Sequence, residues 1–146
     1  MLSQTAIYAL RAIGYIAAQK NTHLVLAKVI SEEMKIPKNF LSKILHKLAQ
    51  KGFIESIRGT NGGFRLGKPA KEISLAQIVE IFMNIAPFQS CFLGIHSCQS
   101  CGITKKWDTI SKQIMELLEG STVDQIFPDI ETKKKNAKQS NKKCKE

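Results

Sequence analysis

The hydrophobic positions of the first fifty residues repeat with the period of α-helices. Residues 3–20, about 26–34 and about 37–51 each carry one apolar stripe, which predicts three short amphipathic helices. Ser3 occupies an N-cap position, Pro37 suits the first turn of the third helix, and Gly52 suits its C-cap. The third helix is expected to bury its apolar residues Phe40, Leu41, Ile44, Leu45 and Leu48.

The period changes after Gly52. Two short apolar runs, residues 53–57 and 64–66, flank a glycine-rich turn at 58–63 and predict a β-hairpin. Ser74 is expected to cap a helix over about 75–84, and a longer helix is expected over 103–118. The predicted fold is mainly α with a small β-hairpin wing, that is, a winged helix-turn-helix followed by a C-terminal dimerisation helix.

The last helix carries an apolar repeat typical of helix pairing. Its apolar positions alternate in steps of four and three: Ile103, Trp107, Ile110, Ile114 and Leu117. The repeat covers only about two heptads, so packing inside one domain explains it equally well. We favour dimerisation through Trp107, Ile110, Ile114 and Leu117, because helix-turn-helix regulators bind two half-sites with two-fold symmetry.

The positive charge is concentrated at the two ends of the chain. Residues 1–68 hold 11 basic and 3 acidic side chains, residues 69–130 hold 4 and 7, and residues 131–146 hold 7 and 2. A compact basic segment is typical of proteins that bind nucleic acid. We expect a DNA-binding domain at 1–68, a cysteine loop with the dimerisation helix at 69–130, and a disordered basic tail at 131–146.

Two segment types are missing from the sequence. It has no apolar run near twenty residues and no signal-peptide pattern after Met1. We therefore expect a cytoplasmic protein that does not contact a membrane.

The polar face of the third helix is the expected DNA-contact surface, because the second helix of a helix-turn-helix pair lies in the major groove. Arg58 stands on the narrow glycine turn, from which a guanidinium can enter the minor groove. The candidate DNA-binding residues are Lys38, Asn39, Ser42, Lys43, Lys47, Arg58 and Asn61. A winged helix that binds RNA or another protein remains an alternative.

Three of the four cysteines and one of the three histidines fall within residues 91–101. Thiolates suit iron or zinc, and in a reducing compartment clustered cysteines favour metal binding over disulfides. The candidate ligands are Cys91, Cys98, Cys101 and His96. The residues alone leave open iron, zinc and a thiol redox switch. An enzyme that uses Cys98 and Cys101 as a redox pair would need a βαβ context, which is lacking, so no enzyme is expected.

The chain resembles the Rrf-type winged-helix transcriptional regulators over about residues 1–127. The likeness rests on Tyr8-Ala-Leu10-Arg-Ala, on Arg58-Gly59 with Gly62-Gly63-Phe64, and on the cysteine loop before Trp107. The resemblance implies a homodimer, usually a repressor, that binds double-stranded DNA at a palindromic operator. It also implies control of DNA affinity by an iron–sulfur cluster (2Fe-2S or 4Fe-4S) that senses redox state, iron or nitric oxide.

The same resemblance bears on the cluster ligands. The three cysteines that hold the cluster in this family match Cys91, Cys98 and Cys101. The histidine ligand of the family falls on Thr104, and an acidic ligand that some members supply falls on Ile7. His96 is therefore the replacement candidate for the fourth ligand, and a small molecule or thiol is the alternative. Cys144, in the tail, is not assigned to the site.

Overall fold

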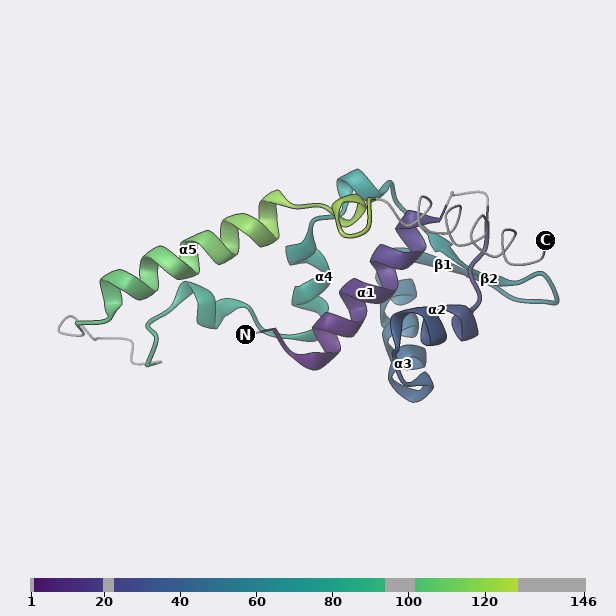
Figure 1. Cartoon of the computed structure of the whole chain (residues 1–146), viewed down its shortest axis with the longest axis horizontal. Helices are drawn as coiled ribbons and strands as arrows, with labels where there is room; N and C mark the ends of the chain where they lie inside the picture. The colour runs from purple at the N-terminus through teal and green to yellow at the C-terminus, as the bar shows by residue number, and fades with distance from the viewer. Residues whose placement is uncertain (1, 20–22, 94–101, 129–146) are drawn as a thin grey trace, which may run out of the picture.

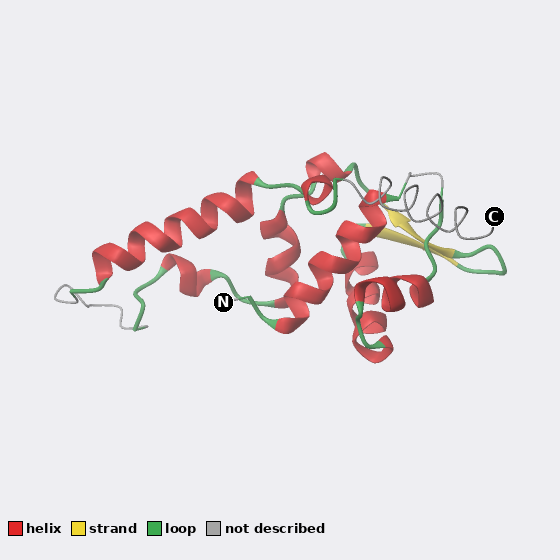
Figure 2. Ribbon diagram, viewed as in Figure 1, coloured by secondary structure: helices red, strands yellow, loops and turns green. Residues whose placement is uncertain are grey.

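The computed structural model describes residues 2–19, 23–93 and 102–128. Its elements follow the order α1 (Gln4–Ala18), α2 (Ala27–Met34), α3 (Lys38–Gln50), β1 (Ile54–Ile57), β2 (Gly63–Leu66), η1 (Ala70–Glu72), α4 (Leu75–Phe82), η2 (Ala86–Gln89), α5 (Thr104–Gly120) and η3 (Val123–Gln125). Helices α1, α2 and α3 gather beside the hairpin, whereas α5 extends away from it on the far side of α4 (Figure 1). The mainly helical fold with a two-stranded hairpin confirms the predicted fold class (Figure 2).

Polar caps set the starts of the helices at the positions that the sequence indicated. The side chain of Ser3 accepts a hydrogen bond from the backbone N–H of Ala6 at 3.1 Å, and Ser74 forms a capping box with Gln77 at the start of α4. Pro37 lies one residue earlier than expected, at the N-cap of α3. Gly52 follows α3 with a left-handed φ of 76°, as expected of a helix-ending glycine.

The hairpin is fixed against the segment that leads into α2. Strands β1 and β2 pair antiparallel, with Ile54 opposite Leu66 and Ile57 opposite Gly63. Val25 and Phe64 exchange two backbone hydrogen bonds of 2.9 Å, so the residues before α2 lie along the hairpin. A Cβ on Gly63 would lie 2.9 Å from the carbonyl oxygen of Val25, which is why this close approach needs glycine. The wing is thereby held at a fixed position relative to α2.

One hydrophobic core lies under the winged-helix elements. Leu41, Ile44, Leu45 and Leu48 of α3 are at most 2% exposed. The core also contains Ile73, Ile78 and Val123, which lie beyond position 68, so later elements pack directly on the winged helix.

Phe40 departs from the sequence prediction. It is 47% exposed, although the apolar pattern placed it in the core. It lies in the first turn of α3, where its ring packs at the surface against Tyr8 of α1, with the ring centroids 6.2 Å apart. The apolar stripe of α3 is therefore narrower at its start than the sequence suggested.

A second core joins α1, α4, η2 and α5. It contains Ala6, Val79, Phe88, Met115 and Leu118, each at most 9% exposed. Small alanines on α1 allow α4 to pack closely, because an alanine side chain adds little bulk between two helix backbones. None of the helices in the described part of the chain is long and apolar enough to span a membrane.

Candidate nucleic-acid interface and cysteine segment

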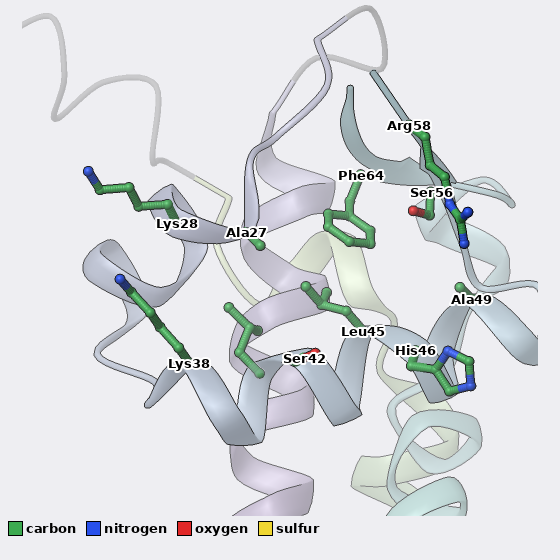
Figure 3. Close-up of a pocket in the computed structure, with 11 residues that line it drawn as sticks. Ala27, Lys28, Lys38, Ser42, Leu45, His46, Ala49, Ser56, Arg58 and Phe64 are labelled. Carbon is green, nitrogen blue, oxygen red and sulfur yellow. The ribbon is translucent and has the colours of Figure 1, made fainter. Parts of the chain in front are cut away.

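A cavity of about 580 Å³ lies between α2, α3 and the hairpin (Figure 3). We call it the wing groove, and its lining residues are Ala27, Lys28, Lys38, Leu41, Ser42, Leu45, His46, Ala49, Ser56, Arg58 and Phe64. Three of these residues are cations, Lys28, Lys38 and Arg58, and none is an aspartate or glutamate. The wing groove is therefore electropositive, and it suits a polyanion better than a cationic ligand.

The helical repeat of α3 orients the polar side of the wing groove. Lys38, Ser42 and His46 are four residues apart, so they lie on one face of the helix. Burial of Leu41, Leu45 and Leu48 on the neighbouring face fixes the rotation of the helix about its axis. Hydrophobic packing thereby places these three polar residues along the lining of the wing groove.

The tip of the hairpin places Arg58 opposite α3. Arg58 follows β1 directly, and a Cβ on Gly62 would lie 2.2 Å from the carbonyl oxygen of Ile57. The turn is therefore tight, and only glycine fits at position 62. Figure 3 shows the Arg58 side chain directed from the wing toward the part of α3 that holds His46 and Ala49.

The predicted DNA-binding residues occupy different parts of this surface. Lys38, Ser42 and Arg58 line the wing groove. Asn39, Lys43 and Asn61 are exposed outside its lining. The ammonium group of Lys47 lies 5.7 Å from the centroid of the Phe82 ring at the end of α4. That contact brings the Lys47 side chain to α4, and Lys47 does not line the wing groove.

Lys28 and His46 are lining residues that the sequence-based list of DNA contacts omitted. The four-residue spacing from Lys38 and Ser42 was a signal for His46. Nothing local indicated Lys28, because its position depends on the pairing of Val25 with Phe64.

The described part of the cysteine segment begins at the end of η2. Cys91 has a free thiol and is partly exposed. On either side of it, the indole Nε1–H of Trp107 donates a hydrogen bond of 2.8 Å to the carbonyl oxygen of Ser90, and the Phe92 ring meets the Trp107 ring edge-on at 5.2 Å between centroids. Trp107 belongs to α5, so this helix restrains both neighbours of Cys91.

The remaining candidate ligands, Cys98, Cys101 and His96, lie outside the described residues, as does the predicted basic tail from position 131. Among the residues that are described, no three histidine, cysteine, aspartate or glutamate side chains gather as a metal site. The donor set in the sequence, three thiols and an imidazole, suits a soft metal, and the free thiol of Cys91 is compatible with it.

Thr104 and Ile7, where the family resemblance would place other ligands, have different surroundings. The Thr104 hydroxyl lies in the first turn of α5, where it is buried without a hydrogen-bond partner. Ile7 is a partly buried residue of α1 whose hydrocarbon side chain offers no donor atom.

The apolar residues of α5 divide between two faces. Trp107 and Ile114 pack on the second core, together with Met115 and Leu118. The other face exposes three aliphatic side chains seven residues apart, which we call the α5 seam: Ile103 at 52%, Ile110 at 51% and Leu117 at 62%. Two of the four predicted dimerisation residues, Ile110 and Leu117, therefore lie on an open surface.

Comparisons with known proteins agree with this architecture. A family model described as Rrf2, iron-dependent transcriptional regulator, matches residues 2–129. An HTH-type transcriptional regulator of Aquifex aeolicus is 33% identical over 132 residues, which cover 87% of this chain and 91% of that protein. The HTH-type transcriptional regulator NsrR of Bacillus licheniformis is 30% identical over 124 residues, which cover 82% and 87% respectively. These relatives are regulators and not enzymes, as the sequence indicated.

Two solved structures share the fold. IscR of T. potens superposes with a TM-score of 0.68 at 22% identity, covering 88% of this chain and 87% of that one. CymR of B. subtilis, called the global cysteine regulator, superposes with a TM-score of 0.70 at 21% identity, covering 85% and 93%. Together with the family match over residues 2–129, these comparisons show that the chain belongs to the Rrf2 family of DNA-binding transcriptional regulators.

Proposed function

We propose that the protein is a homodimeric transcriptional repressor whose affinity for a palindromic operator is controlled by an iron–sulfur cluster at the cysteine segment. The observation that carries the DNA-binding part is the wing groove, which joins α3 to the wing and carries three cations and no carboxylate. We infer that it acts in the cytoplasm.

The DNA-binding residues act in two grooves of the duplex. Lys38 and Ser42 lie in the first two turns of α3, and the N-terminal part of a recognition helix contacts base edges in the major groove. Arg58 on the narrow wing is suited to the minor groove, whose negative potential attracts a guanidinium. Lys28, at the start of α2, is suited to a phosphate beside the major groove.

The α5 seam is the proposed dimer contact. Ile103 and Leu117 are fourteen residues apart, which corresponds to about 21 Å along a helix. Two copies of this seam, related by a two-fold axis, would cover each other's exposed aliphatic groups. The symmetric pair would then present two wing grooves to two half-sites of a palindrome.

The cysteine segment is the proposed input. Cys91, Cys98 and Cys101 would hold the cluster, with His96 as the fourth ligand. A bound iron–sulfur cluster supplies a group that reacts with oxidants and nitric oxide. Through its contacts with Ser90 and Phe92, Trp107 transmits the conformation of Cys91 to α5, which also carries the α5 seam.

A continuous path of contacts leads from α5 to the DNA-binding helix. Met115 and Leu118 of α5 pack with Val79 of α4, and Phe82 at the end of α4 lies beneath the ammonium group of Lys47 on α3. A shift of α5 would therefore reach α3 through packed side chains. A coupling of about 1–3 kcal/mol changes DNA affinity by about 5- to 150-fold, which is enough for regulation.

A zinc site or a cysteine thiol switch on the same fold is the second candidate. The free, partly exposed thiol of Cys91 favours it, because an accessible thiol can be oxidised directly. The likeness to CymR supports it too, since that protein is called a cysteine regulator.

Anaerobic purification followed by iron, sulfide and zinc analysis with an absorption spectrum separates the candidates. The iron–sulfur proposal expects iron and sulfide in near-equal amounts and a visible charge-transfer absorbance. A colourless protein that contains zinc, or no metal at all, would refute the iron–sulfur proposal in favour of the second candidate.

A further inference from the structure

His46 occupies the point where the recognition helix and the wing converge. It is an exposed residue of α3, and it lines the wing groove with Ser56 and Arg58 of the hairpin (Figure 3). It stands four residues beyond Ser42 on the face that begins with Lys38. In a complex in which a duplex contacts both α3 and Arg58, this imidazole would therefore lie near the duplex.

The charged residues that line the wing groove together with His46 are all basic. They are Lys28 of α2, Lys38 at the start of α3 and Arg58 at the end of β1. On its own helix, Lys43 and Lys47 are three residues before it and one residue after it. The acidic side chain of the hairpin, Glu55, pairs with Arg65 at 2.7 Å and does not line the wing groove. The lining of the wing groove therefore offers the imidazole no carboxylate, and a bound polyanion would supply negative charge there.

We propose that His46 is a DNA-backbone contact whose protonation strengthens DNA binding, an inference that rests on the proposed DNA-binding function. A phosphodiester anion next to an imidazole favours its charged form. Histidine gains or loses its charge between about pH 5 and pH 8. Binding of the duplex is therefore linked to the uptake of a proton at His46, and a lower pH in this range tightens the complex.

Linkage bounds the size of this effect. Uptake of one proton for each bound wing groove changes the affinity of that groove by at most about tenfold per pH unit. We expect the duplex to bind about five- to tenfold more tightly at about pH 6 than at about pH 8, since protonation is partial over part of that range.

The test uses the full-length protein, prepared anaerobically so that the cysteines are in one state in all samples. A duplex is first enriched by the wild-type protein from a random-sequence pool. Its dissociation constant is then measured by fluorescence anisotropy at about pH 6 and about pH 8, at one ionic strength, since DNA affinity depends on both conditions.

The variants are His46→Gln, which removes the titrating group, and His46→Lys, which carries a permanent charge. His23→Gln is the matched control, because His23 is exposed before α2 and does not line the wing groove.

The inference expects the pH dependence in the wild type and in His23→Gln, and less than about a twofold change in His46→Gln. His46→Lys should bind at the higher pH at least as tightly as the wild type binds at the lower pH. Wild-type pH dependence in His46→Gln would overturn the inference and leave the proposed function standing. If no duplex is enriched, the proposed DNA-binding function fails, and this inference fails with it.

Discussion

The indole Nε1–H of Trp107 donates a hydrogen bond to the carbonyl oxygen of Ser90 at 2.8 Å. Ser90 directly precedes Cys91, and the ring of Phe92, which directly follows Cys91, meets the same indole edge-on at 5.2 Å between centroids. The sole tryptophan of the chain therefore connects a candidate cluster ligand to the helix that exposes the α5 seam. This relationship explains how a change at Cys91 can reach the α5 seam over a short distance.

Removal of the indole donor should loosen the chain around Cys91. Trp107→Phe keeps a ring for Phe92 but loses the bond to Ser90. A hydrogen bond that contributes about 1 kcal/mol lowers the population of the locally opened state around Cys91 about fivefold. We therefore expect iodoacetamide to alkylate Cys91 about fivefold faster in this variant than in its parent. The rates are measured by mass spectrometry, and both proteins carry Cys98→Ser, Cys101→Ser and Cys144→Ser so that Cys91 is the thiol that reacts.

The matched control for that experiment is Thr109→Val. It removes a hydrogen bond of 3.0 Å between Thr109 and the carbonyl oxygen of Lys105, on the same helix but away from Ser90. Its alkylation rate should equal that of the parent. Equal rates for Trp107→Phe and the parent would show that the indole does not restrain Cys91.

A charge on the α5 seam should separate the proposed dimer. Leu117 and Ile110 are 62% and 51% exposed in the single chain. Burial of one aliphatic side chain contributes about 1.5–3 kcal/mol to association. In a two-fold symmetric dimer each subunit buries the same side chain, so this contribution occurs twice. Leu117→Glu should therefore shift sedimentation velocity profiles from dimer to monomer. Lys105→Glu, an exposed substitution on α5 whose helical position lies away from the seam, should remain dimeric. A dimeric Leu117→Glu would exclude the seam as the interface.

Removal of the wing guanidinium should weaken DNA binding and also its salt dependence. Arg58→Ala is expected to weaken binding to the enriched duplex by about 1–3 kcal/mol. It should also reduce, by about one, the slope of the logarithm of the binding constant against the logarithm of the salt concentration. Anisotropy titrations at several salt concentrations measure both quantities. Lys71→Ala, an exposed cation of η1 outside the wing groove, should change neither. If the two variants behave alike, Arg58 makes no specific contact.

The turn between α2 and α3 holds a strained residue. Lys35 has a φ of 52°, in the left-handed region that glycine adopts without penalty. A left-handed residue other than glycine costs about 1–2 kcal/mol, and the greater freedom of glycine in the unfolded chain offsets about 0.5–1 kcal/mol of this. Lys35→Gly should therefore raise the free energy of unfolding by about 0.5–1 kcal/mol, as measured by urea titration. Lys51→Gly serves as the comparison, because Lys51 has a φ of −86° and gains nothing from glycine. A loss of stability in Lys35→Gly would show that the lysine side chain stabilises this turn.

The local sequence predicted the elements well where a cap or a buried stripe defined them. Ser3 and Ser74 marked helix starts that the structure confirms, because a side-chain cap acts within three residues. The sequence could not show that Phe40 is exposed, since its burial depends on how far α1 extends over α3. Likewise, the heptad repeat of α5 could not show that Trp107 packs inward while Ile110 remains open, because η2 and α4 decide which face is covered.

The candidate DNA-contact residues show the same division between local and tertiary information. Helical spacing correctly placed Lys38 and Ser42 on one face of α3. It gave no reason to separate them from Lys47, whose contact with Phe82 depends on the packing of α4. The position of Lys28 required the hairpin and the start of α2 to be brought together.

Control of DNA affinity by the cluster is tested most directly by one pair of dissociation constants. The enriched duplex is titrated anaerobically with one protein preparation, before and after a stoichiometric dose of nitric oxide, and iron and sulfide are assayed in both samples. We predict a protein that contains iron and sulfide and whose dissociation constant rises by about 5- to 150-fold after treatment. Equal dissociation constants before and after treatment would contradict the proposal that a cluster at Cys91, Cys98 and Cys101 controls DNA binding.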